Sequence, residues 1–168
     1  MALVVLVGLP GSGKTTTGRA LAQTLGRAFV DTDEVFYERE HVSVQDYLRS
    51  HDEAAFRERE LAALSQALTT SSVVSTGGGT VTTPAARRVL AAELTVWLDC
   101  PDEVLVARVG QGDRPLLEGD PAQRIVQLRA QRDPFYLEVS RFRVDSSRPL
   151  DQLVMQLANI VETAQANS

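Results

Sequence analysis

The sequence predicts an α/β fold built on a parallel β-sheet, and two observations support that class. Short apolar runs rich in β-branched residues alternate with longer amphipathic segments, which is the rhythm of repeated strand–helix–strand units. The first apolar run leads into a glycine-rich turn that opens the first amphipathic segment. The chain has 168 residues, of which 43% are hydrophobic, so it can bury one core and has little room for a second. We therefore expect residues 1–168 to form a single domain.

Five apolar runs are expected to form the strands of the sheet, at residues 3–7, 28–30, 72–75, 95–98 and 142–144. The first and fourth runs are continuously apolar, as expected of strands that are buried on both faces. Arginines interrupt the fifth run, which is the weakest of the five signals.

Helical spacing predicts three of the helices, over residues 14–25, 53–68 and 149–165. Gly26 is suited to end the first of these helices in a left-handed conformation. Thr83 and Asp120 each stand before a proline, so a further helix is expected to start after each of them. Ser43 begins a looser version of the capping box, with aspartate in place of the preferred glutamate.

Composition excludes several classes of partner and compartment. The net charge of -5 and the sequence pI of about 5.1 argue against nucleic acid or an anionic membrane, because both attract positively charged surfaces. Cys100 is the only cysteine, so an intrachain disulfide framework is excluded. The first apolar run lacks the preceding basic residues of a signal peptide, and no run approaches membrane-spanning length. We expect a cytoplasmic protein, and a monomer because no long apolar surface stripe stands out.

The glycine-rich turn fits the phosphate-binding pattern G-x-x-x-x-G-K-[ST], because residues 8–15 read G-L-P-G-S-G-K-T. Glycines let the backbone wrap a phosphate with its N–H groups pointing inward, and the helix N-terminus adds a favourable dipole. Lys14 is the only lysine among seventeen basic residues, and we expect it to neutralise the β and γ phosphates of a nucleotide. We expect the Thr15 hydroxyl to bind Mg²⁺. The residues of this turn and helix that are expected to bind ATP are Gly11, Ser12, Gly13, Lys14, Thr15 and Thr16.

Two carboxylates, those of Asp31 and Asp33, stand at the end of the second predicted strand. In open α/β sheets this carboxyl end is where ligands bind. One carboxylate can hold a magnesium-bound water, while the other can orient an acceptor hydroxyl or take its proton. A helix N-cap is the alternative role for Asp33.

Two arginines lie on predicted helices at positions that suit a binding site. Arg57 precedes Glu60 by three residues, so the two share a helix face and could alternatively form only a surface ion pair. Arg132 precedes Pro134, which is expected to kink or end its helix and so to aim the arginine. Otherwise Arg132 is one more solvated charge.

Two loop motifs complete the set of candidate sites. Three glycines at residues 77–79 follow the third strand and form a backbone bare enough for a ligand to press against, although a tight turn is the alternative. Arg114 lies in a glycine- and aspartate-rich segment over residues 110–119 that is expected to be mobile. An arginine there can stabilise transition-state charge when a lid closes, or it can be a solvated loop charge.

Together these residues indicate the chemistry of the phosphate acceptor. Arginines near a phosphate cradle in an acidic chain suggest an acceptor with its own carboxylate, because the planar guanidinium matches that group with two parallel hydrogen bonds. The paired aspartates suggest that the acceptor also carries hydroxyls. The acceptor is therefore expected to be a small polyhydroxylated acid.

The ordered motifs resemble those of the shikimate kinase family. They are G-L-P-G-S-G-K-T, D-T-D, F-R-x-x-E, G-G-G, R-P-L-L and R-x-P-x-Y, between Gly8 and Tyr136. The resemblance implies transfer of the γ-phosphoryl group of ATP to the 3-hydroxyl of shikimate, in the pathway to chorismate and the aromatic amino acids. It also implies a three-layer P-loop kinase fold with a five-stranded parallel sheet in the order 2-3-1-4-5 and helices on both faces. A shikimate-binding region over about residues 32–60 and a mobile lid over about residues 110–120 are implied as well.

The resemblance assigns roles to individual residues. Lys14, Asp33 and Arg114 are implied to be catalytic, with Asp33 either a base or only an orienter of the hydroxyl. Mg²⁺ is implied to bind Thr15 directly and Asp31 through water. The residues implied to bind shikimate are Asp33, Arg57, Gly78, Gly79 and Arg132. Those implied to bind ATP beyond the phosphate turn are Arg108, Arg114 and Arg148, although the segment over residues 108–113 is about one residue shorter than the family pattern.

Two other functions remain as alternatives. A gluconate-type kinase shares the phosphate turn and also takes a sugar acid, but its D-G-D-x-x-H-P stretch is absent from the sequence. A nucleotide-binding module without catalysis would keep the phosphate turn and lose the acceptor residues, all of which are present here.

Overall fold

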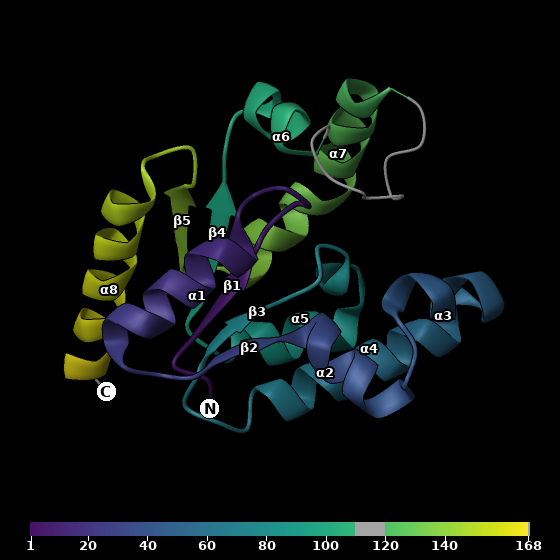
Figure 1. Cartoon of the computed structure of the whole chain (residues 1–168), viewed down its shortest axis with the longest axis horizontal. Helices are drawn as coiled ribbons and strands as arrows, with labels where there is room; N and C mark the ends of the chain where they lie inside the picture. Colours follow the sequence, from purple (N-terminus) through teal and green to yellow (C-terminus); the bar gives the residue numbers. More distant parts are fainter. Residues whose placement is uncertain (110–119, 168) are drawn as a thin grey trace.

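Five parallel strands form one sheet in the computed structural model, which describes residues 1–109 and 120–167 (Figure 1). The strands are β1 (Val4–Val7), β2 (Phe29–Asp31), β3 (Val73–Ser75), β4 (Thr95–Asp99) and β5 (Phe142–Asp145). Their order across the sheet is β2-β3-β1-β4-β5, and every neighbouring pair is parallel. The five predicted strands and the implied strand order are therefore confirmed.

The described residues form eight α-helices, in addition to the short 3₁₀ helix η1 (Thr80–Thr82). These are α1 (Lys14–Leu25), α2 (Thr32–Glu40), α3 (Val44–Ser50), α4 (Glu53–Ala67), α5 (Pro84–Ala91), α6 (Asp102–Val109), α7 (Pro121–Val139) and α8 (Leu150–Ala166). The predicted starts at Pro84 and Pro121, the Gly26 C-cap and the Ser43 N-cap are all confirmed.

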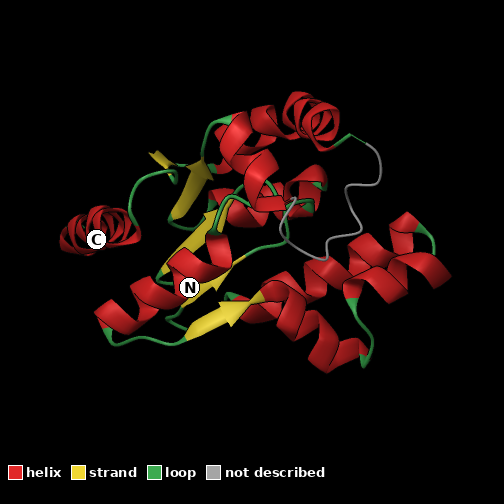
Figure 2. Cartoon of the chain, turned by 45° about the horizontal axis from the view of Figure 1, so that its top comes forward, coloured by secondary structure: helices red, strands yellow, loops and turns green. Residues whose placement is uncertain are grey.

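Helices cover both faces of the sheet, as Figure 2 shows. Along β1 the side chains alternate: Val4 and Leu6 pack in a core with α1 and α8, whereas Val5 and Val7 pack in a second core with α2, α4, α5 and α7. None of the four β1 side chains is exposed, as expected of a central parallel strand. The chain thus has the three layers that the family resemblance implied.

Pro134 was expected to kink or end its helix, and the second of these alternatives is wrong, because α7 continues to Val139. Proline removes one N–H donor, so it breaks only one bond of the helical ladder. The turn beyond it carries Tyr136 and Val139, which are 0% and 2% exposed. Burial of these side chains against the sheet holds the last turns of the helix in place.

Helical spacing did not predict helix α2. The apolar residues of α2 that are buried, Val35 and Phe36, are adjacent in sequence and form no recurring helical stripe.

The start of α2 decides the alternative role of Asp33, that of the helix N-cap. Asp31 is the N-cap residue, and its carboxylate accepts a hydrogen bond from the Asp33 amide at 3.0 Å. Asp33 lies in the first helical turn instead.

Across the part of the chain that the structure describes, no helix combines the length and the apolar character needed to cross a membrane.

Gly18 tests how closely α1 packs on the sheet. A Cβ at this position would lie 2.5 Å from the ring of Phe29. Alanine normally stabilises a helix relative to glycine, but here Gly18→Ala is expected to lower the free energy of unfolding by about 1–3 kcal/mol through overpacking. Urea unfolding measures this change.

The matched control is Gly26→Ala, since a Cβ there would meet nothing within 4 Å. Gly26 has a left-handed backbone with a φ of 61°, which alanine adopts only at a cost. Gly26→Ala should therefore lower the free energy of unfolding by about 1–2 kcal/mol for this reason alone. A gain of stability in Gly18→Ala would contradict the close contact with Phe29.

Candidate active site

The phosphate turn between β1 and α1 has the backbone conformation that its glycines predict. Gly11 and Gly13 have φ angles of 83° and 88°, in the left-handed region that glycine adopts without strain. Lys14 is 8% exposed, and its ammonium donates hydrogen bonds to the carbonyls of Gly8 and Leu9, at 2.8 and 3.0 Å. Lys14 thus lies folded over the turn in which a phosphate group would sit.

A cavity of about 400 Å³ lies beside the phosphate turn. Its lining includes Gly11, Gly13, Lys14, Thr15, Thr16, Arg108 and Arg148. Arg108 comes from α6 and donates to the carbonyls of Gly11 and Ser146, at 3.2 and 3.0 Å. The structure thus brings together most of the residues predicted to bind ATP.

Thr15, which lines this cavity, lies side by side with Asp31. The Thr15 hydroxyl donates a hydrogen bond to Oδ2 of Asp31 at 3.0 Å. The other carboxylate oxygen of Asp31, Oδ1, accepts a hydrogen bond from the Asp33 amide. The N-terminus of α2 therefore fixes the position of the Asp31 carboxylate. Two hard oxygen donors, a hydroxyl and a carboxylate, therefore stand next to the phosphate turn.

The three glycines after β3 lie where several parts of the chain converge. The Gly77 amide donates to the Thr32 hydroxyl at 3.1 Å, and a Cβ on Gly77 would lie 3.2 Å from Oδ1 of Asp33. A Cβ on Gly78 would lie 2.9 Å from Pro10 of the phosphate turn. These distances leave no room for a side chain, so the glycine turn places Asp33 next to the phosphate turn.

Arg57 and Arg132 converge on the last of these glycines from α4 and α7. A Cβ on Gly79 would lie 3.1 Å from both terminal nitrogens of Arg57 and 3.5 Å from a nitrogen of Arg132. Both side chains are partly buried rather than solvated. The two guanidiniums therefore present hydrogen-bond donors at one place, which suits a carboxylate.

Glu60 lies in a buried environment, whereas the sequence indicated a surface position for it. The surface ion pair that was the alternative for Arg57 and Glu60 does form, at 2.7 Å, but Glu60 is only 7% exposed. Its other oxygen accepts a hydrogen bond from the Thr80 hydroxyl at 2.9 Å. The spacing of Arg57 and Glu60 predicted the pair, but burial by η1 depends on contacts distant in sequence.

Comparisons with known proteins identify the family to which this arrangement belongs. The family model described as shikimate kinase matches residues 10–162. The shikimate kinase of Corynebacterium jeikeium is 41% identical over 162 residues, which cover 94% of this chain and 87% of that protein. The shikimate kinase of Aromatoleum aromaticum is 44% identical over 151 residues, covering 87% and 86%. The chain belongs to the shikimate kinase family. It is accordingly an ATP-using phosphotransferase.

Solved structures agree with this membership. The shikimate kinase from Acinetobacter baumannii in complex with shikimate superposes with a TM-score of 0.88, at 31% identity over 96% of this chain and 93% of that one. A gluconokinase from Sinorhizobium meliloti has a TM-score of 0.69 at 20% identity, so it shares the fold alone. The P-loop kinase fold is confirmed, and the gluconate-type alternative is set aside by the family match.

One predicted catalytic residue of the family, Arg114, lies outside the described residues. The predicted lid over about residues 110–120 lies there too, apart from Asp120, whose carboxylate caps α7.

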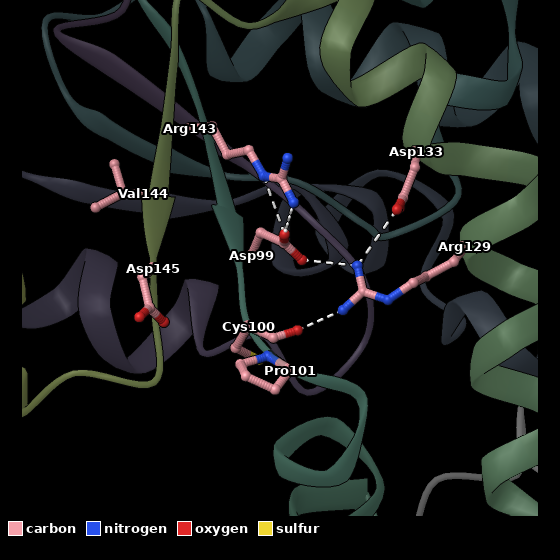
Figure 3. Close-up of a pocket in the computed structure, with 8 residues that line it drawn as sticks. All are labelled: Asp99, Cys100, Pro101, Arg129, Asp133, Arg143, Val144 and Asp145. Carbon is pink, nitrogen blue, oxygen red and sulfur yellow. Dashed lines mark hydrogen bonds and ion pairs between the residues drawn. The ribbon is translucent and has the colours of Figure 1, made fainter.

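A charged cluster beside the nucleotide cavity holds α7 against the sheet (Figure 3). Arg129 of α7 bonds to Asp99 at the end of β4 at 2.7 Å, and it also contacts Asp102 of α6 and the carbonyl of Cys100. Arg143 of β5 binds the other oxygen of Asp99, at 3.0 Å from Nε. No local pattern predicts this cluster, because Asp99 and Arg129 are 30 residues apart in sequence. Its effect is to fix the helix that carries Arg132.

The two arginines of this cluster should contribute unequally to stability. The Arg129 side chain is 19% exposed, whereas that of Arg143 is 61% exposed. Arg129→Ala leaves half-buried carboxylates without their main partner and is expected to lower the free energy of unfolding by about 3 kcal/mol. Arg143→Ala should cost less than about 1 kcal/mol. Urea unfolding of both variants measures the difference, and equal losses would contradict the central place of Arg129.

Proposed function

We propose that the chain transfers the γ-phosphoryl group of ATP to the 3-hydroxyl of shikimate, giving shikimate 3-phosphate and ADP. One observation carries the proposal: Gly78 packs against Pro10 of the phosphate turn, with a Cβ-equivalent distance of 2.9 Å. The acceptor residues on the glycine turn are therefore next to the place where the γ phosphate would lie. Transfer between two bound substrates then requires mainly positioning and charge neutralisation.

The acceptor carboxylate is assigned to Arg57, Arg132 and the backbone of Gly78 and Gly79. The guanidinium nitrogens lie within 3.1–3.5 Å of the Cβ position of Gly79, so this part of the site is rich in hydrogen-bond donors. Glu60 holds Arg57 in place through its 2.7 Å ion pair. A carboxylate matches this set, because each of its oxygens accepts hydrogen bonds.

Asp33 is assigned to the hydroxyl that attacks the phosphate. Its Oδ1 lies 3.2 Å from the Cβ position of Gly77, on the same turn that touches Pro10. A carboxylate there accepts a hydrogen bond from the 3-hydroxyl and directs its oxygen toward the γ phosphate. Asp33 acts as a base or as an orienter of this hydroxyl.

The nucleotide phosphates are assigned to the phosphate turn and Lys14, with Arg108 and Arg148 lining the same cavity. Thr15 would hold Mg²⁺ directly and Asp31 would hold it through water, and this oxygen pair fits the hard cation. When bound, Mg²⁺ neutralises charge on the β and γ phosphates. Within the described ranges, no group of three or more His, Cys, Asp or Glu could hold a metal. The family motif assigns Arg114 to the transferred phosphate.

We further propose a single domain over residues 1–168 that acts as a monomer in the cytoplasm without nucleic-acid partners. The net charge of -5 supports the last point, because it repels polyanions. The acceptor region over about residues 32–60 comprises α2, α3 and the first half of α4, and it extends to one side of the sheet (Figure 1).

A coupled assay of ADP release tests the proposed function. With MgATP, the chain is expected to turn over shikimate and not gluconate. Release of ADP with gluconate alone, or with neither acid, would overturn the assignment of the acceptor.

Arg132→Ala tests the carboxylate assignment. The loss of a charge-assisted hydrogen bond should raise the KM for shikimate by about ten- to hundredfold, with the KM for ATP nearly unchanged. Steady-state kinetics with each substrate varied in turn measure this split.

Arg141→Ala is the matched control, because Arg141 is exposed at the amino end of the sheet, away from the glycine turn. An equal rise in the KM for ATP after Arg132→Ala would count against the proposed role.

A further inference from the structure

Tyr136 is a buried polar residue that the reaction as described above does not use. It lies on α7, one turn after Arg132, and its side chain is 0% exposed. Its hydroxyl donates a hydrogen bond of 2.6 Å to the carbonyl of Gly78. A tyrosine 58 residues further along the chain is therefore hydrogen-bonded directly to the acceptor turn.

The Gly78 carbonyl and the Gly79 amide belong to the same peptide unit. In a planar trans peptide these two groups point in opposite directions, so a partner that fixes the carbonyl also aims the amide. Glycine offers no side chain to restrict its own backbone, and a Gly-Gly peptide is the most easily rotated of all. The hydrogen bond from Tyr136 restricts the rotation of this peptide, which the glycine side chains cannot do.

The amides of Gly78 and Gly79 are available to a ligand. Over residues 1–109 and 120–167, neither amide donates a hydrogen bond to a protein acceptor. Gly79 is also the residue on which Arg57 and Arg132 converge, with distances of 3.1 and 3.5 Å to its Cβ position. An aimed Gly79 amide would therefore complete the donor set of the two guanidiniums.

The protonation state of Tyr136 suits a permanent donor. Burial raises the pKa of its hydroxyl above the ordinary value, although the positive charge of Arg132 opposes this rise. The hydroxyl therefore keeps its proton throughout the working pH range.

We propose that Tyr136 is a positioning residue for the acceptor. Its hydroxyl holds the Gly78–Gly79 peptide in the one orientation in which the Gly79 amide faces the substrate carboxylate. The proposal rests on the acceptor role assigned above to the glycine turn, and it adds a residue to which neither the motifs nor the arginine geometry gave a task.

Tyr136→Phe removes the hydroxyl and keeps the ring. It is expected to raise the KM for shikimate about five- to tenfold, with changes below about twofold in the KM for ATP. The neighbouring Trp97, the only tryptophan of the chain, lies 5.6 Å from the Tyr136 ring, so its fluorescence reports whether the packing is retained.

Thr95→Val is the matched control for the loss of a buried hydroxyl. The Thr95 side chain is 0% exposed and donates to the Leu90 carbonyl at 2.7 Å, at the start of β4 and away from the site. The Thr95→Val substitution should lower the melting temperature about as much as Tyr136→Phe does, with no change in the KM for shikimate or for ATP. A Tyr136→Phe variant that matched Thr95→Val in both respects would overturn the proposal, because the hydroxyl would then be purely structural.

A substrate analogue locates the effect. With a methyl group in place of the shikimate carboxylate, the ratio of kcat/KM between the natural chain and Tyr136→Phe should fall toward one, because a methyl group offers the aimed amide no acceptor. A ratio as large as that with shikimate would overturn the link to the carboxylate. Activity of the natural chain with shikimate is measured in parallel, so failure of the proposed function is distinguished from failure of the role of Tyr136.

Discussion

The candidate site depends on one steric constraint, the absence of side chains at three consecutive positions after β3. Gly77 meets Asp33, Gly78 meets Pro10, and Gly79 meets the two arginines, all at distances that exclude a Cβ or leave it little space. The phosphate turn, α2, α4 and α7 can approach one another only because the backbone between them is bare. Groups from four parts of the chain therefore meet within one small volume, where a phosphate donor and its acceptor must lie side by side.

Strand order explains why these groups can meet. β3 lies between β2 and β1, so its carboxyl end separates the aspartates that follow β2 from the phosphate turn that follows β1. Parallel strands bring all these ends to the same edge of the sheet. The helix α7 packs on the same face of the sheet as α2, α4 and α5, and the Arg129 cluster fixes it to β4 and α6. The residues assigned to the phosphate donor, those assigned to its acceptor and the residues that support them therefore all lie at the carboxyl edge of the sheet.

The sequence predicted features that are encoded locally. Continuous apolar runs defined the strands, the prolines after Thr83 and Asp120 marked two helix starts, and the motifs named nearly all the residues that the structure brings together. Features set by distant contacts were not predicted. Helix α2 has no apolar stripe, Glu60 is buried by η1, and α7 passes Pro134 because its next turn is packed into the core. In each case tertiary burial overrides a local signal.

The nearly complete replacement of lysine by arginine has a consequence for alkaline solution. Sixteen of the seventeen basic residues carry guanidiniums, which keep their charge above pH 12, whereas lysine side chains normally lose theirs near about pH 10.4. The ion pair of Arg129 with Asp99 therefore persists at pH values where most proteins have lost much of their positive charge. Alkali should leave the electrostatic framework of the fold intact, so that an alkaline loss of activity and an alkaline loss of structure become separate events in this chain.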